Sequence, residues 1–147
     1  MKVLVAGATG FIGKQVLLLL RNCGHEIRVL TRNCETAGVR LPIACKVFAW
    51  DSLIGEPPAE AFKDVDAILN LAGENIAGGL WTKARMSRIL QSRVLSVRHL
   101  VEAIRKLDSP PKVFVSASAI GIYGDRGSES LTESSAPGTG PLAEVCK

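Results

Sequence analysis

The sequence has no apolar run long enough to cross a membrane. Its 147 residues are 47% hydrophobic and 22% charged, which is ordinary for a globular protein. No stretch approaches the roughly 20 apolar residues of a membrane-spanning helix. The first apolar residues run directly into Gly7, which leaves no room for the apolar core of a signal peptide. We therefore expect a cytoplasmic protein with no membrane partner.

Cysteine is scarce and is not arranged for metal binding. The four cysteines stand at positions 23, 34, 45 and 146, and the sequence contains no CxxC pair. None lies within metal-ligand spacing of another, so we expect no metal site. Because cytoplasmic thiols stay reduced, we interpret all four as free thiols.

The excess of positive over negative charge lies in one segment. The chain carries a net charge of +4, whereas residues 82–107 alone hold seven basic residues and one acid, a net +6. Aromatic residues make up only 5% of the chain, none lies among these bases, and no nucleic-acid motif accompanies them. We expect a solvated helix face, or contacts to the phosphates of a ligand, and no nucleic-acid partner.

Strand-like and helix-like segments alternate along the chain. Five short β-rich runs stand at residues 2–6, 26–31, 45–49, 67–71 and 112–117. Helical patterns cover 11–22 and 82–107, a Gly, Ser and Pro-rich loop covers 118–141, and a new helix begins near Pro141. The apolar helix at 11–22 is expected to pack between the sheet and a neighbouring helix. The alternation predicts one α/β domain over residues 1–147, a Rossmann-type doubly wound parallel sheet.

A glycine-rich turn joins the first strand to the first helix. It reads Gly7-Ala8-Thr9-Gly10-Phe11-Ile12-Gly13. The first glycine permits the tight turn, the second lets a pyrophosphate approach the backbone, and the third lets the helix pack on the strand. The helix N-terminus adds unpaired N–H groups and a partial positive charge. The sequence therefore predicts a dinucleotide site at residues 7–13.

The end of the second strand indicates which dinucleotide is bound. An acid there favours NAD by bonding the ribose 2′-hydroxyl, but this chain has Thr31-Arg32-Asn33. Arg32 can bond a 2′-phosphate with two N–H groups, and Thr31 can add a hydroxyl. We expect NADP(H) in preference to NAD(H). The alternative is that Arg32 is a solvated loop residue.

Two further segments follow strands along the same edge. Trp50-Asp51 comes after the third strand, where an adenine ring would lie, although Asp51 could equally cap or turn the chain. Leu71-Ala72-Gly73 ends the fourth strand and would pass near the cofactor ribose and pyrophosphate, with Gly73 allowing close approach.

The motifs also resemble one known family. The G-x-x-G-x-x-G spacing is similar to that of extended short-chain dehydrogenases/reductases. Three further segments resemble an atypical branch of this superfamily, the epimerase family proteins that are similar to short-chain dehydrogenase/reductase family 39U member 1. These segments are Ala-Gly-Glu-Asn-Ile at 72–76, Ser-Arg-Val at 92–94 and Ser-Ala-Ser-Ala-Ile-Gly-Ile-Tyr-Gly at 116–124. The resemblance implies an NADP(H) site that includes Arg93, or else Arg88, unless these are solvated helix residues. It also implies that a C-terminal, substrate-covering part of the natural domain is missing.

The usual catalytic pair of the superfamily is incomplete. The resemblance implies a Tyr followed four residues later by a Lys, but Ala143 stands four residues before Lys147. Tyr123 is the only tyrosine, and Gly127 follows it at that spacing. We take Ser118, with Ser116 as the alternative, Tyr123 and Lys147 as candidate catalytic residues, although Lys147 could be a surface lysine.

Two functions therefore stay open at this point. One is an oxidoreductase or epimerase-like enzyme acting on an unidentified small carbonyl or sugar-like substrate. The other is a cofactor-binding sensor or partner-binding module without turnover. The apolar stripe from Met86 to Ile104 could form a homodimer interface through the 82–107 helix, or could simply pack on the sheet.

Overall fold

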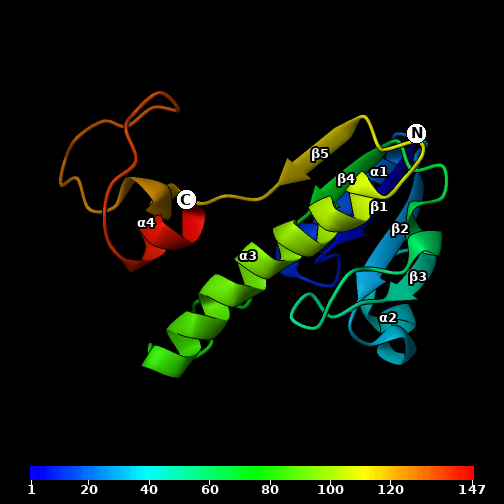
Figure 1. The fold of residues 1–147 in the computed structure, drawn as a ribbon, viewed down its shortest axis with the longest axis horizontal. Helices are drawn as coiled ribbons and strands as arrows, with labels where there is room; N and C mark the ends of the chain where they lie inside the picture. The colour runs from blue at the N-terminus through cyan, green and yellow to red at the C-terminus, as the bar shows by residue number, and fades with distance from the viewer.

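The computed structural model describes all residues from Met1 to Lys147 and contains one five-stranded parallel sheet (Figure 1). The strands run in the order β3-β2-β1-β4-β5, and every neighbouring pair is parallel. This order confirms the Rossmann-type fold predicted from the sequence. The strands are β1 (Lys2–Ala6), β2 (Glu26–Thr31), β3 (Lys46–Ala49), β4 (Ala67–Asn70) and β5 (Val113–Ser116); the helices are α1 (Phe11–Asn22), α2 (Cys34–Arg40), α3 (Lys83–Arg105) and α4 (Pro141–Cys146), with short 3-10 helices η1 (Ala59–Phe62) and η2 (Ile120–Tyr123).

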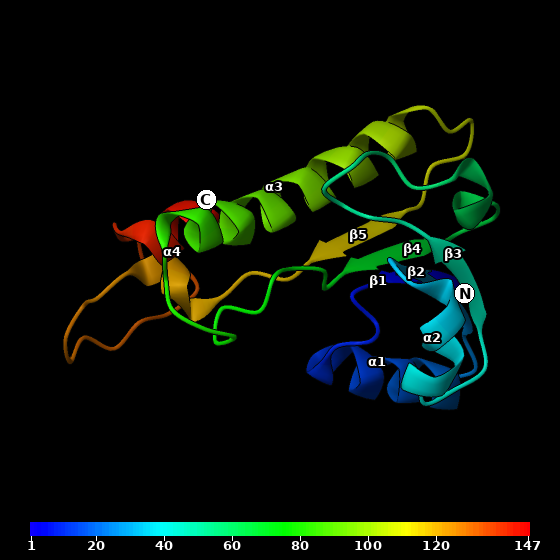
Figure 2. The ribbon, with the colours of Figure 1, turned by 90° about the horizontal axis from the view of Figure 1, so that it is seen from below.

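Helices cover both faces of the sheet, as Figure 2 shows. Helices α1 and α2 lie on one face and α3 lies on the other. The side chains of β1 alternate between the two faces: Val3 and Val5 join one buried cluster with Leu17 of α1, whereas Leu4 joins a second cluster with Leu100 of α3. Burial on both faces explains why β1 is apolar from Val3 to Ala6.

Helix α2 was not predicted from the sequence. It is only seven residues long, with Gly38 near its middle, so its apolar periodicity is too short to recognise. Its start is fixed by Asn33, whose side-chain oxygen accepts a hydrogen bond from the Thr36 N–H at 3.0 Å. Helix α1 also differs from expectation, because only Gly13 and Leu17 are buried and its outer face is exposed.

Helix α3 packs on the sheet along only part of its length. It begins at Thr82, whose hydroxyl accepts the Arg85 N–H, and ends before Pro110-Pro111. Toward its C-terminal end, Leu100 is fully buried against the sheet. Nearer its start, Leu90 and Val94 remain exposed. The buried side of the helix is formed by Ile89, Ser92, Ser96, Leu100 and Ala103, one position away from the apolar stripe predicted from Met86 to Ile104; of the stripe residues, Ile104 packs against a core cluster, whereas Leu90 and Val94 face the surface.

The last strand forms an exposed edge. All four residues of β5 are exposed, including Phe114 at 36% and Val115 at 47%. Beyond β5, the chain runs out in an extended link to η2 and α4, which lie beside the first half of α3 (Figure 1). We call residues 1–116 the sheet region and residues 117–147 the C-terminal segment.

The C-terminal segment is organised mainly around its own backbone. The Gly138 N–H donates to the Ile122 carbonyl at 2.9 Å, so the chain crosses itself next to Gly124. A methyl group at Gly138 would collide with the Tyr123 carbonyl, so the crossing requires glycine there. Helix α4 packs on η2, and its Ala143 is the one buried residue of the segment.

The four cysteines are free thiols, as predicted. Burial raises the pKa of the Cys45 thiol. No three His, Cys, Asp or Glu side chains gather in a metal-binding arrangement. None of the helices is both long enough and apolar enough to cross a bilayer.

Candidate functional site

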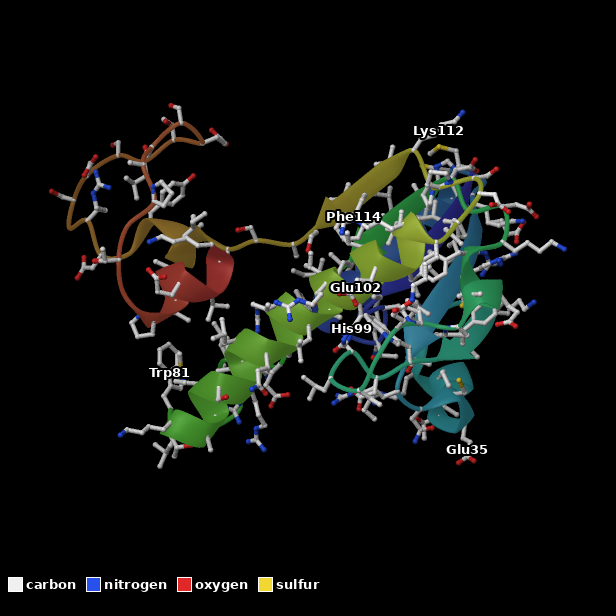
Figure 3. All side chains as sticks on the ribbon, in the orientation of Figure 1. Glu35, Trp81, His99, Glu102, Lys112 and Phe114 are labelled. Carbon is white, nitrogen blue, oxygen red and sulfur yellow. The ribbon has the colours of Figure 1, made fainter.

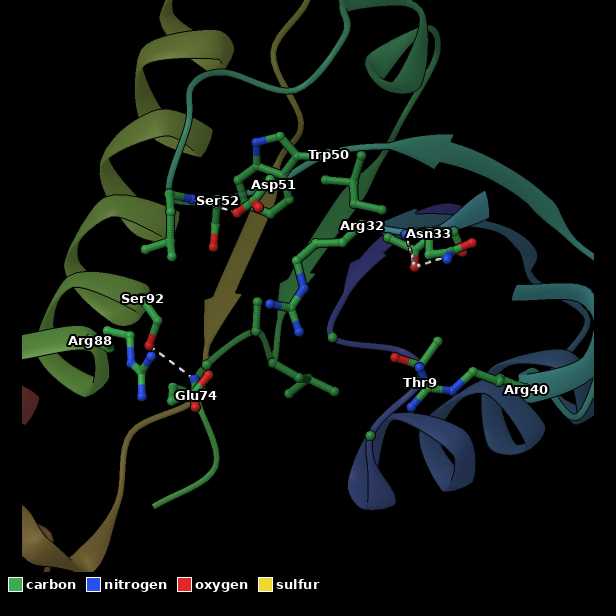
Figure 4. A pocket seen from close by; sticks show the side chains of 18 residues that line it. Thr9, Arg32, Asn33, Arg40, Trp50, Asp51, Ser52, Glu74, Arg88 and Ser92 are labelled. Carbon is green, nitrogen blue, oxygen red and sulfur yellow. Dashed lines mark hydrogen bonds between the residues drawn. The ribbon is translucent and has the colours of Figure 1, made fainter. Parts of the chain in front are cut away.

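A cleft of about 450 Å³ opens at the carboxyl ends of the strands (Figure 4). It lies over β1 and β4, where the strand order reverses, which is the position where parallel α/β sheets bind ligands. Its walls come from the glycine turn, the end of β2, the loop after β3, the loop after β4, and α3. Ten of the predicted cofactor residues line it: Gly7, Thr9, Gly10, Thr31, Arg32, Trp50, Asp51, Leu71, Ala72 and Gly73.

The glycine turn is tight enough to exclude side chains. Gly7 has a positive φ of 79°, and a methyl group there would lie 2.5 Å from the Leu71 carbonyl carbon. A methyl group at Gly13 would lie 2.7 Å from Cα of Ala8, where α1 packs against the turn. These contacts give both residues the roles predicted for them: Gly7 turns the chain beside β4, and Gly13 lets the helix approach.

The start of α1 carries free hydrogen-bond donors. Its N-cap residue is Gly10, which has no capping side chain, and the first backbone bond of the helix is from the Lys14 N–H to the Gly10 carbonyl at 3.1 Å. The N–H groups of Phe11, Ile12 and Gly13 therefore have no acceptor within the protein. The side chains of Phe11 and Ile12 are exposed and lie outside the cleft, so these residues can serve a ligand only through their backbone.

The end of β2 lines the cleft with hydrogen-bond donors. Arg32 is exposed and forms no ion pair or hydrogen bond, and Figure 4 shows its side chain extending into the opening. Thr31 forms long contacts of 3.4 and 3.5 Å with the Asn33 backbone. Arg40, at the end of α2, also lines the cleft and has no partner. No carboxylate comes from this wall.

The loop after β3 forms a rigid wall. Trp50 is 7% exposed, and its indole N–H donates to the Gly55 carbonyl at 2.7 Å, so only part of the residue reaches the cleft. The Asp51 carboxylate accepts a hydrogen bond from the Leu53 N–H at 2.9 Å, which is the turn-forming role that the sequence left open for Asp51. Asp51 also lines the cleft. His99 of α3 (Figure 3) bonds the Ser52 carbonyl at 3.0 Å and fixes the loop from the other side.

The loop after β4 is held by the first half of α3. The Glu74 N–H donates to the Ser92 hydroxyl at 2.9 Å, and the Glu74 carboxylate lies 3.9 Å from Arg85. Arg85 also contacts the Asn75 carbonyl. Glu74 and Ser92 both line the cleft. The contacts with α3 therefore fix the loop after β4 at the edge of the cleft.

The arginines of α3 divide into two groups. Arg93 donates to the carbonyls of Glu74 and Ile89, each at 3.2 Å, and its guanidinium lies close to Gly73. It thus supports the loop and does not line the cleft, whereas Arg88 does line it and has no partner. Of the two arginines weighed from the sequence, Arg88 is the one that faces the site.

The candidate catalytic residues lie outside the cleft. Ser118 is exposed and unbonded, Tyr123 lies in η2, and Lys147 pairs with Glu144 at 2.9 Å. Ser116, the alternative to Ser118, accepts a hydrogen bond from Asn70 at 3.3 Å and helps join β5 to β4. Ser118 forms no hydrogen bond, whereas Ser116 keeps only its O–H donor and one acceptor position for a ligand.

Sequence reasoning missed several cleft residues. Arg40 was overlooked because α2 was not recognised, although Asn33 followed by a short polar helix was the available signal. Ser52, Leu53 and Glu74 follow strands that were predicted, and Ser92 lies within a predicted helix, but nothing in their spacing showed that they line the cleft.

Comparison with known proteins places the chain within a family. Residues 3–144 match the model of the NAD dependent epimerase/dehydratase family. An epimerase family protein of Bacillus subtilis, YfhF, is 34% identical over 137 residues, which is 92% of this chain and 43% of the relative. The chain thus spans less than half the length of such relatives.

Two solved structures are similar over 99% of the chain. The human epimerase family protein SDR39U1, crystallised with NADPH, superposes with a TM-score of 0.79 at 29% identity, and 46% of it is covered. A nucleoside-diphosphate sugar epimerase of Corynebacterium glutamicum gives 0.77 at 34% identity, with 28% covered. These matches agree with the glycine turn and the strand order: the chain belongs to the NAD dependent epimerase/dehydratase family, in the short-chain dehydrogenase/reductase fold.

Proposed function

We propose that the cleft binds a nicotinamide dinucleotide, NADP(H) in preference to NAD(H), and that the protein acts as an oxidoreductase or epimerase-like enzyme on a small carbonyl or sugar-like substrate. The observation that carries the proposal is the pairing of the glycine turn with Arg32 at the end of β2, on a wall without carboxylates. The human relative crystallised with NADPH supports the same cofactor.

The residues of the cleft fit such a cofactor. The free N–H groups of Phe11, Ile12 and Gly13 at the start of α1 suit a pyrophosphate. Arg32 suits a 2′-phosphate, and Asp51 lies on the wall where an adenine ring is expected. A cleft of about 450 Å³ lies within the range of small-molecule and cofactor sites.

The chemistry divides between the cofactor and the protein. A bound nicotinamide ring supplies hydride transfer. The backbone at Leu71, Ala72 and Gly73 lines the cleft and would pass near the ribose and pyrophosphate of the bound cofactor. The Ser118 hydroxyl would hold the substrate oxygen, and the Tyr123 phenol would donate or accept the proton. Because both lie on the C-terminal segment, they act only if that segment meets the cleft.

The second candidate function is an NADP(H)-binding module without turnover. It is favoured by Ala143, which is buried in α4 four residues before Lys147 and offers no hydroxyl there. The location of Ser118, Tyr123 and Lys147 outside the cleft also favours it.

Calorimetric titration with NADPH and NADH tests the binding proposal. We expect NADPH to bind at least about tenfold more tightly, and Arg32→Ala to remove that difference, since the lost bonds are charge-assisted. Arg105→Ala is the matched control, because Arg105 is an exposed arginine that lies outside the cleft. Equal affinities for the two cofactors, or an unchanged ratio in Arg32→Ala, would contradict the preference.

Turnover is tested separately. NADPH oxidation is followed with a panel of carbonyl compounds and nucleotide sugars, with Tyr123→Phe as the variant. Substrate-dependent oxidation that the variant abolishes supports the enzyme. Tight NADPH binding without turnover across the panel supports the binding module.

A further inference from the structure

We propose that Arg40 is a second cation for the ribose phosphate, so that two arginines on separate elements set the cofactor preference of the cleft. This inference rests on the proposed function. Arg32 follows β2, whereas Arg40 ends α2, a helix that the sequence pattern did not reveal. Both line the same cleft.

The first support is the side-chain chemistry of this wall. Arg32 and Arg40 make no ion pair or hydrogen bond, so both guanidinium groups are free to bind a ligand. The Asn33 oxygen is used by the Thr36 N–H, which leaves its amide N–H groups as donors. The Thr9 hydroxyl has no partner. The wall thus presents donors and two full positive charges, as a phosphomonoester dianion requires.

The second support is the direction of the Arg40 side chain. In Figure 4 it points from the end of α2 toward Thr9 of the glycine turn, while Arg32 extends from the end of β2. An anion between the turn and β2 would therefore meet cations from two elements. The acids of the cleft, Asp51 and Glu74, come from other walls.

The third support is that α2 is held in a defined position. Asn33 caps its first turn at 3.0 Å, and the Leu41 N–H donates to the Ala37 carbonyl at 2.9 Å at its end. Ala37 is fully buried in the core cluster on that face of the sheet. The backbone that carries Arg40 is thus fixed before any ligand binds, which reduces the entropy lost on binding.

The test uses two small probes that differ in one phosphate. Binding of adenosine 2′,5′-bisphosphate and of 5′-AMP is measured by calorimetry on the full chain, for the wild type, Arg40→Ala, Arg40→Lys and Arg32→Ala. We expect Arg40→Ala to weaken the bisphosphate about tenfold while 5′-AMP stays within about twofold. Arg40→Lys keeps the charge without the planar fork, so a loss of about threefold is expected. Arg105→Ala again serves as the control.

The outcomes separate the two proposals. Suppose that the wild type prefers the bisphosphate, that Arg32→Ala removes this preference and that Arg40→Ala keeps it. Arg40 then has no role in binding the phosphate, and the proposed function stands. If the wild type binds the two probes equally, or binds neither, both proposals are overturned. If Arg40→Ala weakens both probes equally, Arg40 shapes the cleft without reading the phosphate, and the inference is also overturned. Arg40 is exposed, so the substitution leaves the core intact.

Discussion

The sheet region and the C-terminal segment differ in what holds them together. All but one of the 28 buried residues lie between Val3 and Ala103, and the exception is Ala143. Every wall of the cleft belongs to the sheet region. The candidate catalytic residues, Ser118, Tyr123 and Lys147, all belong to the C-terminal segment. Binding and proton chemistry therefore depend on parts of the chain with different structural support, and each can be perturbed without the other.

The largest expected effect comes from a glycine in each region. Gly7→Ala forces an alanine into φ 79° and places its methyl group 2.5 Å from Leu71, so we expect a loss of about 4 kcal/mol in the free energy of unfolding and no cofactor binding. The matched control is Gly127→Ala in the C-terminal segment, where φ is 58° but no atom lies within 4 Å. The Gly127→Ala substitution should lower the free energy of unfolding by about 1 kcal/mol. Urea unfolding measures both, and similar losses would show that the two regions are equally constrained.

The next effect compares side chains on neighbouring strands. Ile68 of β4 is fully buried, whereas Val115 of the adjacent β5 is 47% exposed. We expect Ile68→Ala to cost about 3 kcal/mol of unfolding free energy, and Val115→Ala less than about 1 kcal/mol. Urea denaturation is again the measurement. A comparable cost at Val115 would mean that another surface covers β5 in solution.

A smaller effect tests whether binding is independent of the C-terminal segment. Tyr123→Phe removes a hydroxyl that lies outside the cleft, so the NADPH dissociation constant should stay within about twofold of the wild type. Calorimetric titration of the wild type and the variant with NADPH measures the two dissociation constants. A tenfold weakening would show that the segment closes over the bound cofactor and that cofactor binding depends on both regions.

The smallest effect concerns thiol reactivity in the two regions. Burial raises the pKa of Cys45, so its thiolate fraction at pH 8 is lower than that of an ordinary thiol. Cys146 of the C-terminal segment makes one sulfur contact, to the Ala119 carbonyl at 3.8 Å. In a Cys23→Ser, Cys34→Ser background, we expect iodoacetamide to modify Cys146 about fivefold faster, with the ratio shrinking as the pH rises toward the pKa of Cys45. Mass spectrometry of digests gives both rates, and faster modification of Cys45 would reverse the expected order.

The sequence predicted those features that depend on local spacing. The glycine turn, the five strands and the limits of α3 each leave a pattern within about 25 residues, and the structure has them within one or two residues of the expected bounds. Arg32 was found because it directly follows a recognisable strand. Its outward direction and lack of partners agree with the role expected for it.

Features that depend on packing were beyond the reach of spacing arguments. Helix α2 is too short for a periodic signal, so Arg40 was missed with it. Arg88 and Arg93 lie on the same helix, and only the position of the loop after β4 decides which one turns toward the cleft. The β5 sequence is as apolar as that of a buried strand, yet β5 is exposed, because burial depends on what lies beside the strand.

The backbone crossing at Gly138 also determines where the chain can be lengthened. Because the Gly138 N–H donates to the Ile122 carbonyl, the ends of the intervening loop are joined without help from its tip. Residues 127–134 are all exposed. The entropy of closing a loop grows slowly, by about 0.6 kcal/mol for each doubling of length. An epitope or a fluorescent reporter inserted after Glu129 would therefore extend the loop outward, leaving the crossing and the cleft as they are.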